Sequence, residues 1–324
     1  MSPVSAPASD SRPQASPSPA SARGDRAWCP HHHDRRGGAK GTQPLRVLSL
    51  GAGVQSTTVL LMSCRGVLPQ LDAAVFSDTK WEPAEVYEHL DWLTEEAARH
   101  GIPVHRVSNG DLRRHTLEGF VGGTAARGER YASLPLFVRN PDGSQGMIRR
   151  QCTREYKIVP IEQFIRRELL GLKPGERAPR EAVDQWFGIS ADEMRRVRIS
   201  RDHWKRHIYP LTGLHEGYLD RPYTRHMCEH WLRTHYPHRE VPRSACIGCP
   251  YHTNAEWRRI KLQPDQWADA IEVDRAIRYA DGMDGEVYLH RDCVPLETVD
   301  LRTDEEKGQM AFDFRAECLG YCGN

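Results

Sequence analysis

The sequence lacks any apolar run long enough to cross a membrane. Its mean hydropathy is −0.66 over 324 residues, so we expect no contact with a lipid bilayer. Residues 1–20 are rich in Pro, Ser and Ala and lack the apolar core of a secretory signal peptide. Together these absences predict a cytoplasmic protein.

An excess of charge of one sign is also lacking. The chain has 45 Lys and Arg against 44 Asp and Glu, a net charge of +1. This balance excludes a protein that coats nucleic acid over its whole surface, but it leaves room for a local basic patch. Residues 1–44 contain many Pro, Ser, Gly and Arg residues and little apolar periodicity, which predicts a disordered tail.

From residue 45 onward, β-prone apolar runs alternate with segments that carry apolar residues at helical spacing. This alternation predicts an α/β fold with a parallel sheet, in which ligands bind beyond the carboxyl ends of the strands. The glycine-rich residues 119–130 predict a loop, and the basic residues 195–206 indicate either a phosphate-binding segment or a solvated helix face. The predicted strands are residues 46–50, 73–76, 104–107 and 183–189, with a hairpin within 134–150, and the predicted helices cover 56–62, 82–97, 160–170, 192–198, 254–262 and 271–279.

A glycine-containing turn follows the first predicted strand. Gly51 and Gly53 allow a sharp bend that leaves main-chain N–H groups free to face an anion, and the helix that follows adds its positive N-terminal end. The hydroxyls of Ser49, Ser56 and Thr57 can donate to phosphate oxygens. No Lys follows the glycines as in a Walker loop, and the third glycine of a dinucleotide fingerprint is absent. The turn therefore indicates a phosphate site of another kind, or an ordinary tight connection.

This turn resembles the PP-loop of the N-type ATP pyrophosphatases, the superfamily that contains the phosphoadenylyl-sulfate (PAPS) reductases. That loop reads Ser-x-Ser-Gly-Gly-x-Asp-Ser. Ser49 and Ser56 match its outer serines and Gly53 its second glycine, whereas Gly51 replaces the inner serine and Gln55 replaces the aspartate. A main-chain cradle for phosphate or sulfate survives these changes.

Three more segments carry the same resemblance. Residues 76–83 are similar to the Asp-Thr-Gly-x-x-x-Pro-Glu segment of the family, and residues 208–211 to its Tyr-Pro-Leu. Residues 187–196 resemble Gly-Ile-Arg-x-x-Glu-Ser-x-x-Arg, with Ser190 in place of the first arginine. The resemblance spans residues 45–249.

The resemblance implies an adenine-nucleotide α-hydrolase-like domain, of the HUP or Rossmann-like type, over residues 45–240. A C-terminal cysteine-bearing helical segment would cover residues 241–324. Asp78 would contact the nucleotide or Mg²⁺. The residues implied to bind the adenine nucleotide are Ser49, Gly51, Gly53, Gln55, Ser56, Thr57, Asp78, Gly188, Glu193 and Arg196.

Nine cysteines in a chain of this length suggest metal or redox chemistry before disulfides. Cys246 and Cys249 form a Cys-x-x-Cys turn whose thiolates can converge on one metal. Cys152 lies in the cationic stretch 149–157, which favours its thiolate and suits an anionic substrate. The layout is similar to that of adenylyl-sulfate reductases, with one cysteine fewer, and implies a [4Fe–4S] cluster; structural zinc is the alternative. The fourth ligand would be Cys228, Cys318 or Cys322, or an iron would stay open.

The last residues contain Glu317-Cys318-Leu319-Gly320, which resembles the Glu-Cys-Gly-Leu-His ending of assimilatory sulfonucleotide reductases. In those enzymes the cysteine attacks the sulfate. The resemblance implies that Cys318 is a catalytic nucleophile, resolved by Cys322. A metal-ligand pair or a frayed end is the alternative.

Three functions follow from these features. The first is an oxidoreductase that reduces a sulfonucleotide with electrons from a thioredoxin-like donor, with Cys318 and Asp78 as catalytic residues. The second is a transferase that uses ATP to adenylate and thiolate a nucleic acid or a small molecule, with sulfur from a cysteine desulfurase. The third is a non-catalytic, zinc-stabilised nucleotide-binding module, which the replacements at Gln55 and Ser190 favour.

Overall fold

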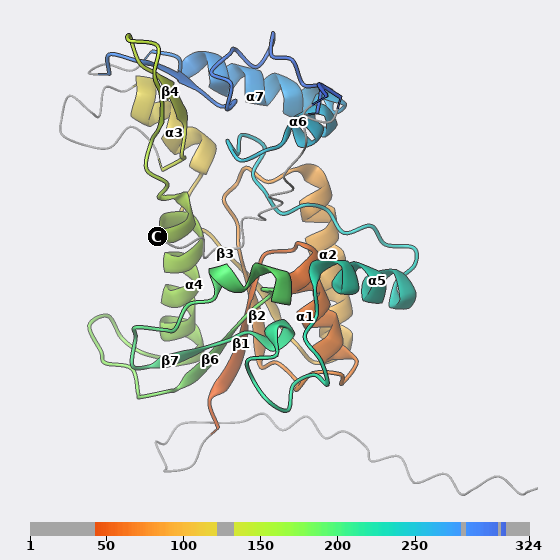
Figure 1. Cartoon of the computed structure of the whole chain (residues 1–324). Helices are drawn as coiled ribbons and strands as arrows, with labels where there is room; N and C mark the ends of the chain where they lie inside the picture. The colour runs from red at the N-terminus through yellow and green to blue at the C-terminus, as the bar shows by residue number, and fades with distance from the viewer. Residues whose placement is uncertain (1–42, 122–132, 280–282, 304–305, 309–324) are drawn as a thin grey trace, which may run out of the picture. The chain divides into compact units, whose positions relative to one another are not determined.

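The computed structural model describes residues 43–121, 133–279, 283–303 and 306–308 (Figure 1). Nearly all of the predicted tail and most of the predicted loop at 119–130 lie outside these ranges, as do Cys318 and Cys322. The chain from residue 43 onward groups as one compact unit. None of the described helices is long and apolar enough to cross a membrane.

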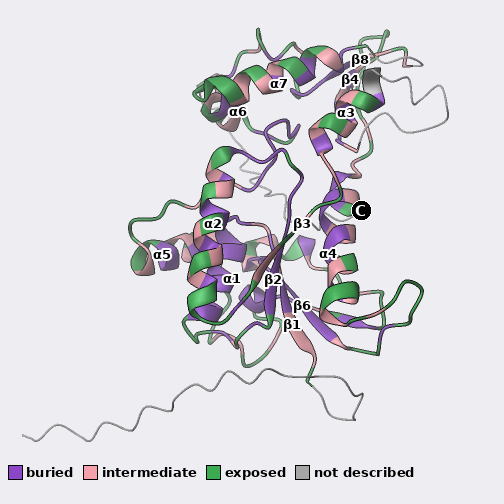
Figure 2. Cartoon of the chain, turned by 180° about the vertical axis from the view of Figure 1, so that it is seen from behind, coloured by how far each residue is buried: buried purple, intermediate pink, exposed green. Residues whose placement is uncertain are grey.

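A five-stranded sheet in the order β3-β2-β1-β6-β7 forms the centre, and each neighbouring pair whose register is defined runs parallel. This arrangement confirms the α/β fold with a parallel sheet. The residues of β2 and β6 are buried throughout, as expected for strands covered on both faces (Figure 2). The strands are β1 (Leu45–Leu50), β2 (Ala73–Ser77), β3 (Val104–Val107), β6 (Val183–Phe187) and β7 (Lys205–Ile208).

Helices cover both faces of this sheet (Figure 1). Leu48 joins a core cluster with residues of α1 (Val54–Cys64), α2 (Ala84–Arg99) and α5 (Arg225–His235). Its neighbour Val47 joins a second cluster with Ile161 of α4 (Val159–Phe164), because successive strand residues face opposite sides. The π-helical turns Thr153–Ile158 and Ile165–Leu169 continue α4 at either end.

A smaller layer carries a second core. It contains α3 (Leu112–Val121), α6 (Asn254–Lys261), α7 (Pro264–Ala276) and an antiparallel sheet in the order β5-β4-β8. Its strands are β4 (Phe137–Arg139), β5 (Gln145–Met147) and β8 (Glu286–Tyr288). Because β8 pairs with β4, the segments before and after residue 240 share one sheet.

Two local expectations are corrected. Part of the basic stretch 195–206 does not form a solvated helix face: residues from Lys205 form the edge strand β7, and the Lys205 ammonium is buried beside Glu162 and Asp202. The predicted loop at 119–130 begins later than expected, because α3 extends to Val121.

Candidate nucleotide turn and cysteine cavity

The turn after β1 lies at the carboxyl end of that strand, next to the carboxyl end of its neighbour β6. Ala52 has a φ of 58°, uncommon for a residue other than glycine. Gly53 caps α1, which has no side-chain cap and no acidic residue in its first turn. Gly188 follows β6 and approaches the turn so closely that an added Cβ would lie 2.4 Å from the Ser56 nitrogen. The structure thus joins the two predicted nucleotide segments at the carboxyl ends of β1 and β6.

The hydroxyl groups of this turn bond within the protein. Ser56 Oγ accepts from the Gly51 N–H and donates to the Gly53 carbonyl, both at 3.2 Å. Thr57 Oγ1 lies 3.0 Å from His89 Nε2, and Ser49 Oγ accepts from a neighbouring strand residue. An anion at this turn therefore relies on main-chain N–H groups more than on the hydroxyls that the sequence suggested.

Gln55 occupies the centre of a buried network. Its Nε2 donates to Ser190 Oγ at 3.3 Å and to Glu193 Oε2 at 3.0 Å. Glu193 in turn pairs with Arg196 at 2.7 Å. Gln55 and Ser190 are two of the positions at which the sequence departs from the PP-loop family, and they contact each other. The Gln55 Oε1 accepts from the Arg225 guanidinium at 3.3 Å, so the neutral amide bridges a hydroxyl, a carboxylate and a guanidinium, and the two replacements are compatible.

Asp78 follows β2 and is almost fully buried, with 8% of its side chain exposed. Its Oδ1 accepts from the Lys80 main-chain N–H at 2.7 Å and from the Tyr87 hydroxyl at 2.9 Å. The Lys80 ammonium lies 3.0 Å from Oδ2. Burial and the bond to Asp78 raise the pKa of Tyr87, so its hydroxyl keeps the proton that it donates. The carboxylate is therefore held by donors on two sides.

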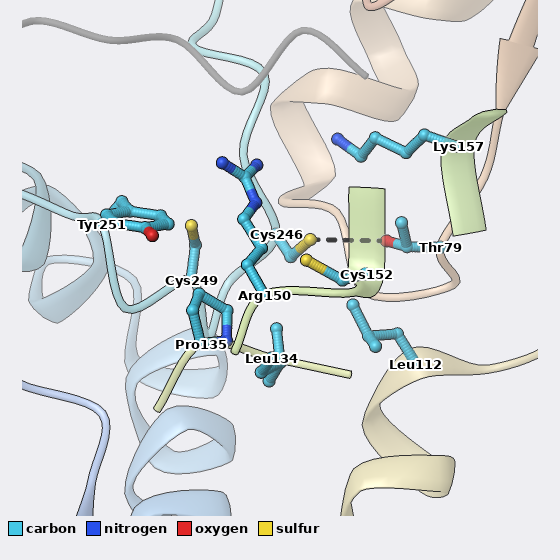
Figure 3. A pocket seen from close by; sticks show the side chains of 10 residues that line it. All are labelled: Thr79, Leu112, Leu134, Pro135, Arg150, Cys152, Lys157, Cys246, Cys249 and Tyr251. Carbon is cyan, nitrogen blue, oxygen red and sulfur yellow. Dashed lines mark hydrogen bonds between the residues drawn. The ribbon is translucent and has the colours of Figure 1, made fainter. Parts of the chain in front are cut away.

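Three predicted metal ligands line one small cavity at the carboxyl end of β2 (Figure 3). Cys246 and Cys249 come from the Cys-x-x-Cys turn, and Cys152 comes from the start of the helix that contains α4. In Figure 3 the side chains of Cys152 and Cys246 point toward one another, and Cys249 lies nearer Tyr251. The cavity is about 10 Å³, room for about one water molecule. The remaining lining residues are Thr79, Leu112, Leu134, Pro135, Arg150, Lys157 and Tyr251.

Trp81 holds the Cys-x-x-Cys turn in place. Its carbonyl accepts from the Ile247 N–H at 2.9 Å, and its indole N–H donates to Asp269 on α7 at 2.5 Å. A Cβ added to Gly248 would lie 2.0 Å from the indole ring, so only glycine fits at position 248 of the Cys-x-x-Cys turn. His252 Nε2 lies 2.9 Å from the Cys246 carbonyl, and burial lowers the His252 pKa to about 3. The ring is therefore neutral and donates this bond.

A buried carboxylate and a buried ammonium stand beside Cys246. Its Sγ lies 3.9 Å from Glu82 Oε1 and 3.7 Å from Thr79 Oγ1. Lys157 Nζ lies 3.9 Å from the same Glu82 oxygen. Burial first, and then the Glu82 charge, raise the pKa of Cys246 well above its usual value, while the Lys157 charge opposes that rise. Without a metal, Cys246 is a thiol at neutral pH.

Cys228 is not brought to this cavity. It lies on α5 and packs in the main core against α1, where burial raises its pKa to about 12. Within the described part of the chain, no three Cys, His, Asp or Glu side chains are arranged as a ready metal site. The three cysteines share a cavity without converging on one point.

Sequence reasoning missed Tyr251 and the role of Trp81. Tyr251 lies two residues after Cys249 and lines the cavity, a position that the spacing could have drawn attention to. Trp81 supports the turn across a long sequence separation, for which no local signal exists. Comparison with protein-family models, curated proteins and solved structures finds no match to this chain.

Proposed function

We propose that the chain is an enzyme of sulfur chemistry, similar to the PAPS reductases, that binds an adenine nucleotide at the turn between β1 and α1. Cys152, Cys246 and Cys249 would hold an iron–sulfur cluster. The observation that carries the proposal is that three cysteines from two distant segments line one buried cavity. The resemblance to the PP-loop family supports the nucleotide and the HUP-type domain.

The donor set fits a thiolate-bound metal centre. Thiolates are the ligands of both iron–sulfur clusters and zinc, and a bound metal replaces the proton that Cys246 otherwise retains. A cluster needs more room than the present cavity provides, so the Cys-x-x-Cys turn and residue 152 would have to separate. When bound, the cluster would supply electrons or an iron that accepts sulfide.

The turn after β1 would receive the phosphates. Its helix N-terminus has no side-chain cap, and the Gln55 network presents no unpaired carboxylate to repel an anion. Asp78 would contact the nucleotide or Mg²⁺, with Lys80 as the cation that Mg²⁺ would displace.

Two reactions suit this arrangement. Reduction of a sulfonucleotide consumes no ATP and needs a mobile cysteine; the six described cysteines are all buried, so that role would belong to Cys318. Transfer of sulfur to an adenylated acceptor consumes ATP and releases pyrophosphate. Among the described residues three thiols gather rather than four, which favours this second reaction, because one iron then keeps an open position.

Anaerobic purification with metal analysis tests the proposal. We expect a coloured protein with about four irons per chain, and loss of that iron in Cys152→Ser, Cys246→Ser and Cys249→Ser. Cys228→Ala is the matched control, because it removes a buried thiol outside the cavity, and it should keep its iron. A colourless protein with one zinc per chain would favour the non-catalytic module instead.

A further inference from the structure

A basic and aromatic edge borders the cysteine cavity. We define the rim as Met147, Arg149, Arg150 and Tyr251. The Arg150 guanidinium lies 5.1 Å from the centre of the Tyr251 ring, and the Tyr251 hydroxyl lies 3.6 Å from the Met147 sulfur. Met147 and Tyr251 are 42% and 41% exposed, and Arg149 is also exposed. Arg150 and Tyr251 also line the cavity (Figure 3). The rim therefore includes residues of the cavity wall as well as exposed ones.

The chain concentrates positive charge here. Residues 147–157 contain three arginines and one lysine against one glutamate, in a protein whose net charge is +1. The carboxylate of that glutamate, Glu155, accepts a hydrogen bond from Ser133. Arg149 and Arg154 are exposed, and neither forms an ion pair with any residue that the structure describes. As far as the described residues show, these two guanidinium groups are open to an anion from solution.

The geometry argues against a small nucleotide as the occupant. A pocket for a small ligand encloses most of that ligand, whereas this cavity has room for about one water. Exposed aromatic rings beside a track of cations instead suit a strand whose bases stack and whose phosphates meet arginines. The near-zero net charge of the chain limits such a contact to a local patch of cations.

We infer that the rim binds a single-stranded nucleic acid, with a base stacked on Tyr251 and a phosphate on Arg149. The inference rests on the proposed function and names the acceptor of its sulfur-transfer reaction. Only the edge of the stacked base would reach the mouth of the cavity. The metal centre held by the cysteine thiolates would then act on that edge of the base, while the rest of the strand stays outside the cavity.

Fluorescence anisotropy with the full chain and a short labelled oligouridylate tests this inference. Tyr251→Ala should weaken binding about tenfold, the loss of one stacked base. Arg149→Glu should weaken binding as well and lower the slope of log Kd against log salt by about 0.7, one phosphate contact. Tyr279→Ala and Arg167→Glu are matched controls at exposed positions outside the rim and should bind as the unchanged chain does.

The outcomes separate this inference from the proposed function. Equal affinity in rim and control variants, equally tight binding of the corresponding duplex, or complete competition by uridine monophosphate at equal nucleotide concentration would each overturn the inference. Iron content is measured on the same preparations. Iron present without strand binding contradicts the inference alone, and strand binding that depends on the rim without iron contradicts the proposed function alone.

Discussion

The turn after β1 and the cysteine cavity lie at the carboxyl ends of neighbouring strands, yet their polar groups are satisfied differently. In the turn, Gln55, Ser56 and Thr57 are bonded to other protein groups and fully buried. In the cavity, thiols and cationic side chains face a shared space. A satisfied network is rigid, whereas a cavity leaves room for a ligand beside the groups that line it. Under the proposed function, the turn would bind the nucleotide and the cavity would hold the reactive metal centre.

The largest expected effect comes from Gly248→Ala, which acts on the cavity alone. The added methyl would lie 2.0 Å from the buried Trp81 ring, so the turn must move, at a cost of about 1–3 kcal/mol or more in unfolding free energy. We expect iron to be lost while nucleotide binding persists. Urea denaturation and metal analysis check this.

Gly146→Ala is the control for that substitution. A Cβ at Gly146 meets nothing within 4 Å, and its backbone is not in the left-handed region. The control should match the unchanged chain in stability and in iron. Full retention of iron in Gly248→Ala would show that the tight contact with Trp81 does not fix the cysteines.

Gly188→Ala acts on the turn. Its methyl would lie 2.4 Å from the Ser56 nitrogen. That nitrogen is a main-chain atom near the start of the fully buried helix α1, so it cannot easily move away. We expect nucleotide affinity to fall at least tenfold with iron content unchanged, measured by calorimetric titration with ATP and with adenylyl sulfate. A lower iron content in Gly188→Ala would show instead that the turn and the cavity are structurally coupled.

Much of the sheet was predictable because its signals are local. The apolar run at residues 73–76 predicts the strand β2, and the helical spacing of Val86, Leu90 and Leu93 predicts the helix α2. The pairing of β4 with β8 could not be predicted. Val138 and Val287 are far apart in the sequence, and each strand has only three residues. The Cys-x-x-Cys turn was visible from its spacing.

Cys228, a predicted candidate for the fourth metal ligand, shows what local sequence signals leave open. Nothing within α5 tells whether Cys228 faces a metal or the apolar surface of α1, because both environments bury a thiol. The partners of Gln55 were also hidden, since Ser190 and Glu193 reach it only through the pairing of β1 with β6. Such contacts belong to the assembled sheet.

Gln55→Asp tests the match between the two replaced positions. The new carboxylate would face Glu193, whose oxygen lies 3.0 Å from the present amide nitrogen, and Arg225, which now donates to the amide oxygen at 3.3 Å. Because the Arg225 charge offsets only part of the repulsion, we expect a loss of about 1–2 kcal/mol at pH 7. Replacing Glu193 by Gln as well should restore most of that loss. Thermal unfolding of the single and double variants measures the coupling, and additive losses would disprove the repulsion.

The smallest expected effect is the pH response of the turn. Burial, together with the Arg239 charge, lowers the pKa of His89 from 6.5 to about 4, so the folded state keeps the ring neutral against Thr57. The unfolded chain binds a proton below pH 6.5 and the folded one does not until about pH 4, so stability falls through that window as pH decreases. The contribution is of the order of 1–2 kcal/mol between pH 7 and pH 5. In His89→Gln, which keeps a donor for Thr57, urea unfolding should show a correspondingly flatter pH dependence; an equal slope would mean that His89 binds its proton over the same pH range in the folded and the unfolded chain.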